Sequence, residues 1–106
     1  MTEEEKCAEY VRTVRNLPKR DLYDQLAEEC CELAQAVHKY VRASGMSPNP
    51  TPVSIERARA NLEEEVEDVL LCMWVLDLIP ADGIRYNKLA RWAGRIEKAF
   101  GRKADE

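Results

Sequence analysis

Apolar residues recur at helical spacing in four segments of this 106-residue chain, and proline-containing stretches separate several of these segments. Residues three or four positions apart lie on one face of a helix, so each segment predicts one amphipathic helix. We find no segment that reads convincingly as a strand. The apolar positions of the first segment are Cys7, Tyr10, Val11, Val14 and Leu17, and those of the last are Ile84, Leu89, Trp92, Ile96 and Phe100. The pattern therefore predicts an all-α protein.

Capping residues and helix breakers predict where these helices begin and end. Asp21 is expected to cap the second helix and Ser54 the third, because their side-chain oxygens can accept from backbone N–H groups of a first turn. Residues 46–53 contain three prolines and predict a stiff, non-helical connector. The residues expected to end a helix are Pro18, Gly45 and Pro80.

Residues 1–106 are predicted to form a single domain, because a chain of this length supports one modest core. Amphipathic helices joined by short connections favour an antiparallel four-helix bundle. A bundle this short is expected to complete its core and its site by forming a homodimer or homotetramer.

Two acidic clusters lie at helical spacing on separate predicted helices. Glu29 and Glu32 share a face of the second helix, and Glu65 and Asp68 share a face of the third. Each pair borders an apolar stripe. Carboxylates in that position repel one another and lose hydration, and a bound cation would offset this unfavourable energy. An oxygen-lined pocket between two helices suits a hard divalent cation such as Mg²⁺. A ferritin-like di-iron site fits poorly, because the only histidine, His38, forms no Glu-x-x-His pair.

The order of these motifs resembles that of the MazG-like all-α nucleoside triphosphate pyrophosphohydrolases. The chain carries EExxE at Glu28–Glu32, ExxD at Glu65–Asp68 and a later helix that bears Lys and Arg. The segments that carry the resemblance are LAEECCELAQAVHKYVR, NLEEEVEDVLLCMWVL and NKLARWAGRIEKAF. The resemblance extends from about Leu26 to Phe100.

This resemblance implies a Mg²⁺-dependent enzyme, with Mn²⁺ as a possible substitute, that converts a nucleoside triphosphate to its monophosphate and pyrophosphate. Glu28 is then a candidate for water activation or for holding a second metal ion. The implied role is nucleotide-pool housekeeping. The residues implied to bind Mg²⁺ are Glu29, Glu32, Glu65 and Asp68.

The last predicted helix carries one cationic edge, formed by Lys88, Arg91 and Arg95 at i, i+3 and i+7. Lys88 and Arg91 are candidates for holding the phosphates that the metal does not neutralise. Asn87 and Arg95 are further candidates for substrate binding. An ordinary solvated basic face is the alternative interpretation.

Two other functions stay open at this point. One is a related all-α pyrophosphohydrolase with a narrower substrate, such as dUTP, dCTP or phosphoribosyl-ATP. The other is a non-catalytic helical interaction module whose acidic edges are only solvated. The net charge of −4 argues against a general nucleic-acid binder. The absence of a signal-peptide pattern or a membrane-length apolar run favours the cytoplasm, where the four cysteines would be reduced.

Overall fold

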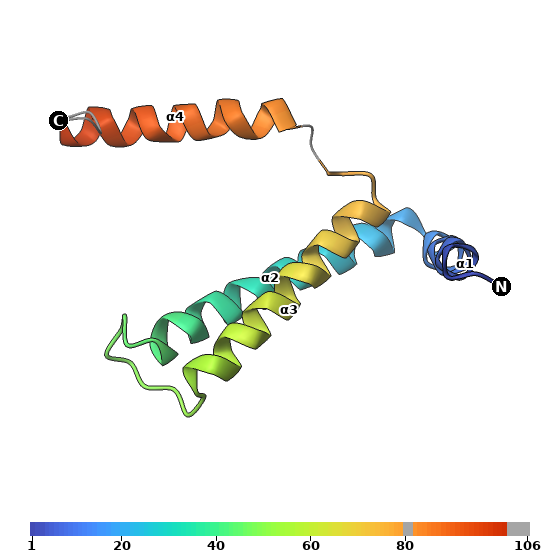
Figure 1. Ribbon diagram of the computed structural model, residues 1–106, viewed down its shortest axis with the longest axis horizontal. Coiled ribbons are helices and arrows are strands. Elements are labelled where there is room, and N and C mark those ends of the chain that lie inside the picture. The colour runs from blue at the N-terminus through green and yellow to red at the C-terminus, as the bar shows by residue number, and fades with distance from the viewer. Residues whose placement is uncertain (80–81, 102–106) are drawn as a thin grey trace.

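The computed structural model describes residues 1–79 and 82–101, and these residues form four helices and no strand. The prediction of an all-α chain with four helices is confirmed. The bounds of the helices are α1 Glu3–Arg15, α2 Lys19–Ala43, α3 Ile55–Val75 and α4 Asp82–Phe100. Figure 1 shows α2 and α3 side by side, with α1 at one end of the pair and α4 apart from it.

Local capping explains most of the helix boundaries. The Ser54 hydroxyl accepts from the Arg57 N–H at 3.2 Å and so caps α3, as the sequence predicted. Gly45 has a φ of 82°, a left-handed conformation that glycine adopts without steric cost, and it directly follows the C-cap of α2. The prediction that Asp21 caps α2 is wrong. The N-cap residue of α2 is Pro18, and no side chain among the described residues caps this helix. Proline suits the start of a helix, because it lacks the backbone N–H that would be left unpaired there.

α2 and α3 form an antiparallel hairpin that carries most of the tertiary contacts (Figure 1). Ala36 and Ala58 are almost fully buried, at 1% and 2% exposure, so small side chains are enclosed along this helix pair. The core cluster consists of Leu22, Val75 and Leu76, with Leu26 packed against it. The connector 46–53 between the two helices contains no helix, as its prolines predicted.

α1 lies near the end of the hairpin where α3 stops. The Arg15 guanidinium donates from Nε to the Val75 carbonyl at 3.1 Å, which satisfies one of the orphan carbonyls at the end of α3. The same guanidinium lies 3.6 Å from the Asp77 carboxylate. Arg15 therefore joins α1 to the chain segment that leaves α3. Pro80, which was predicted to end this helix, lies outside the described residues.

α4 extends away from the hairpin, and its side chains from Arg85 to Phe100 are all exposed (Figure 1). The described part of one chain therefore holds a two-helix hairpin with α1 at its end, and a closed four-helix bundle would need further packing of α4. None of the helices among the described residues combines the length and the apolar character needed to cross a membrane.

Candidate metal centre

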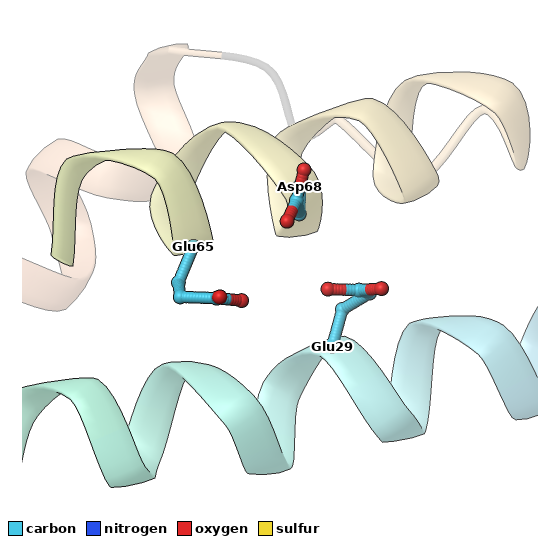
Figure 2. A group of neighbouring side chains, drawn as sticks. All are labelled: Glu29, Glu65 and Asp68. Carbon is cyan, nitrogen blue, oxygen red and sulfur yellow. The ribbon is translucent and has the colours of Figure 1, made fainter. Parts of the chain in front are cut away.

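The middle of the α2–α3 hairpin brings three carboxylates together. Glu29 projects from α2, and Glu65 and Asp68 project from α3 one turn apart. Figure 2 shows the side chains of Glu29 and Glu65 extending into the space between the helices, with Asp68 beside them. The spacing of three residues puts Glu65 and Asp68 on one side of α3. The antiparallel pairing then places Glu29 opposite both.

The distances among these carboxylates suit one divalent cation. One oxygen from each of the three residues lies within 4.8 Å of the others. Oxygens around a single Mg²⁺ are separated by about 3 to 4 Å, because each lies about 2.1 Å from the ion. A small inward rotation of the side chains would therefore complete the three protein ligands. Carboxylate oxygens suit Mg²⁺, which takes near-octahedral geometry and usually keeps waters or substrate phosphates in its other positions.

Two oxygens in this cluster are buried and have no hydrogen-bond partner among the described residues. They are Glu29 Oε2 and Glu65 Oε2. The other oxygen of Glu29 accepts from Gln25 Nε2 at 2.8 Å. A buried carboxylate oxygen without a partner is costly, and direct contact with a cation would satisfy both atoms at once. The residues present therefore fit a divalent metal.

Electrostatics at Glu29 lead to the same conclusion. Burial raises the pKa of Glu29 above its ordinary value, and the nearby charges of Glu32 and Asp68 raise it further. The hydrogen bond from Gln25 opposes this shift by stabilising the charged form. A partly buried carboxylate beside two others is an environment that a positive ion would relieve.

The predicted ligand set is brought together in part. Glu29, Glu65 and Asp68 form the three-oxygen cluster, whereas Glu32 is exposed and its carboxylate does not belong to it. Glu32 is still close enough to influence the pKa of Glu29. Glu28, the candidate for water activation, is exposed on α2.

The cationic residues on α4 are not brought to this centre within one chain. Asn87, Lys88, Arg91 and Arg95 are all exposed, and α4 stands apart from the hairpin (Figure 1). These four residues could contact a substrate at the carboxylates only if α4 packed against a hairpin, and in the described part of a single chain it does not.

A cleft of about 370 Å³ opens beside Glu29 and Asp68. Glu29 and Asp68 line it together with Gln25, and apolar side chains of α1, α2 and α3 form much of its wall. Sequence reasoning missed Gln25, although its i, i+4 spacing from Glu29 was a usable signal. The remaining lining residues are Val14, Leu17, Asp21, Leu22, Leu71, Cys72 and Val75.

Comparisons of the chain with protein-family models, with curated proteins and with solved structures found no match.

Proposed function

We propose that this protein is a Mg²⁺-dependent nucleoside triphosphate pyrophosphohydrolase that releases a nucleoside monophosphate and pyrophosphate. The observation that carries the proposal is the convergence of Glu29, Glu65 and Asp68, with two buried carboxylate oxygens that lack partners. Such a site is suited to a hard cation, and Mg²⁺ commonly binds proteins through one or two carboxylates plus substrate phosphates.

The cleft supplies room for the rest of such a substrate. Its volume of about 370 Å³ is within the range of small-molecule sites, and apolar walls beside a few polar groups are typical of them. A triphosphate would lie at the carboxylate end, near Glu29 and Asp68. The nucleoside would extend along the wall formed by Leu22, Leu71 and Val75.

In the proposed reaction, a water molecule attacks the α-phosphorus and the bond from that phosphorus to the oxygen bridging the β-phosphate breaks. Pyrophosphate leaves with that oxygen, and Glu28, which is exposed on α2, is the proposed acceptor of a proton from the water. Bound Mg²⁺ would offset charge on the phosphates. Lys88 and Arg91 stay predicted phosphate contacts, with Asn87 and Arg95 as predicted substrate contacts, all dependent on how α4 packs.

Product analysis tests this proposal. The purified full chain is incubated with each NTP and dNTP, with and without Mg²⁺, and the products are separated. We expect metal-dependent formation of monophosphate and pyrophosphate. Selectivity for one base would identify the narrower enzyme, such as a dUTP or dCTP hydrolase. Diphosphate and orthophosphate as products would contradict the proposed cleavage site.

Two substitutions connect the activity to the carboxylates. Glu29→Gln and Asp68→Asn should each lower turnover at least about a hundredfold, because each removes a charged ligand. Glu64→Gln is the matched control, since Glu64 is exposed on α3 and lies outside the cluster. Full activity in Glu29→Gln would overturn the metal assignment.

A helical interaction module is the second candidate function, and the exposed apolar side chains of α3 and α4 favour it. Calorimetric titration with Mg²⁺ separates the two candidates. The enzyme is expected to bind the ion, and an interaction module with solvated acidic edges is not.

A further inference from the structure

The chain exposes far more surface than a compact protein of its mass. Its accessible surface is 8840 Å² at 12.2 kDa. A compact monomer of that mass exposes about 6,100 Å². The radius of gyration is 18.8 Å, against about 13 Å for a compact domain of this length. To reach that compact exposure, two such chains would together have to cover roughly 5,500 Å², which is at the upper end of the range for obligate homodimers.

Most of the large apolar side chains that α4 exposes form one stripe. Leu89, Trp92, Ile96 and Phe100 follow one another at intervals of three or four residues, which puts them on one side of the helix. Between 47% and 76% of each residue is exposed. An amphipathic helix of this kind normally buries its stripe against another element.

A matching stripe lies on α3. Val66, Leu70 and Trp74 recur every four residues and are 40–47% exposed. At about 100° per residue, Leu70 lies well over 100° around α3 from both Glu65 and Asp68. The α3 stripe is therefore separate from the candidate metal centre.

The charges beside the two stripes are opposite. Residues 85–100 of α4 contain five Lys or Arg and one Glu, whereas α3 contains six acidic residues and two Arg. Glu63 and Glu67 lie on the side of α3 that carries its stripe, and Glu63 already pairs with Arg59 at 2.9 Å. Lys88 and Arg95 border the stripe of α4 on the side of Trp92. Opposite charges beside two apolar stripes favour the association of the stripes and fix the register in which the helices pack.

We propose that α4 of one chain packs on the α3 stripe of a second copy, and that the second copy returns its own α4 in the same way. Pairing the α3 stripes of two hairpins would place Glu63 and Glu67 of both copies near one another, which is unfavourable. In the reciprocal exchange, each acidic flank meets a basic one, and both stripes lose contact with water. The docking of α4 does not depend on the proposed enzymatic activity.

Light scattering coupled to size exclusion tests the assembly on the full chain. The wild-type protein should have the mass of a dimer. Trp92→Glu should weaken association at least about tenfold, because it puts a charge at the centre of the apolar stripe. Ala90→Glu adds the same charge outside the stripe, more than about 100° around α4 from its centre, and should leave the mass unchanged. A monomeric wild-type protein, or a Trp92→Glu variant with undiminished association, would overturn the proposal.

Charge reversal distinguishes exchange between copies from packing within one chain. Glu63→Lys/Glu67→Lys and Lys88→Glu/Arg95→Glu should each be largely monomeric when alone. In an equimolar mixture every interface again joins opposite charges, so a heterodimer should form. Separate monomers in the mixture would show that α4 folds back on its own hairpin. Dimers of each variant alone would contradict the charge contact. All readouts here are masses, so their failure is distinct from a failure to hydrolyse nucleotides.

Discussion

Glu29 is the residue on which the metal proposal depends most. It has one buried oxygen without a partner and one that accepts from Gln25. Adding Mg²⁺ should raise the midpoint of thermal unfolding, because a ligand that binds only the native state stabilises it. The gain is about 2.7 kcal/mol at a hundredfold excess over Kd. Glu29→Gln should remove most of this shift in calorimetry, and Glu64→Gln should retain it. An undiminished shift in Glu29→Gln would place the ion elsewhere.

The raised pKa of Glu29 makes a second prediction, on pH. In the folded, metal-free protein this carboxyl binds its proton more tightly than in the unfolded chain, where the ordinary value is 4.5. The folded state therefore loses stability as the pH rises from 4.5 through the raised pKa, and regains it as the pH falls. Glu29→Gln should be free of this loss. Thermal melts of both proteins in chelator, from about pH 4 to pH 7, measure the difference.

Competition between proton and metal gives the opposite trend when Mg²⁺ is present. The carboxylate must be ionised to bind the cation, so Mg²⁺ affinity should fall as the pH falls through the raised pKa of Glu29. Titration calorimetry over the same pH range checks this trend. A constant affinity across that range would contradict the participation of Glu29.

At the scale of the element, α3 depends on its N-terminal cap. The Ser54 hydroxyl accepts from the Arg57 N–H, and its loss leaves an orphan donor in the first turn. Ser54→Ala should lower the free energy of unfolding by about 1 kcal/mol, whereas Ser54→Asp should retain the cap. Urea denaturation of the three proteins provides the comparison. Equal stability of the alanine variant would show that the cap contributes little to α3.

The pairing of α2 with α3 depends on small buried residues. Ala58 is 2% exposed, so a larger side chain has no room without displacing the helices. Ala58→Leu should destabilise the protein by about 1–3 kcal/mol through overpacking. Ala60→Leu is the control, since Ala60 is exposed on the same helix. Similar urea midpoints for the two variants would contradict close packing at Ala58.

At the scale of the whole molecule, stability should depend on concentration. If each α4 is buried only against a second copy, the folded state is favoured by mass action and the thermal midpoint rises with protein concentration. Calorimetry at two concentrations about a hundredfold apart measures this. Trp92→Glu should melt at the same temperature in both samples. A constant midpoint for the wild-type protein would indicate that the chain is stable without a partner.

Several features of this protein were determined by the sequence alone. Apolar spacing predicted four helices because the period of 3.6 residues is a local property. Ser54 and Gly45 predicted two boundaries for the same reason, since a cap depends on adjacent backbone. The start of α2 was mispredicted at Asp21 because Pro18 is compatible with an N-cap position without a side-chain hydrogen bond. The side-by-side placement of Glu65 and Asp68 also followed from helical spacing.

The relation between helices was decided only by the tertiary structure. Helical spacing placed Glu32 beside Glu29, but the rotation and register of α2 against α3 leave Glu32 exposed and bring Glu29 to Glu65 and Asp68. The burial of two carboxylate oxygens and the cleft beside them also depend on that register. The stripe of α4 was visible in the sequence, yet its separation from the hairpin was not. An amphipathic pattern specifies that a face must be covered, and the packing of the other elements decides what covers it.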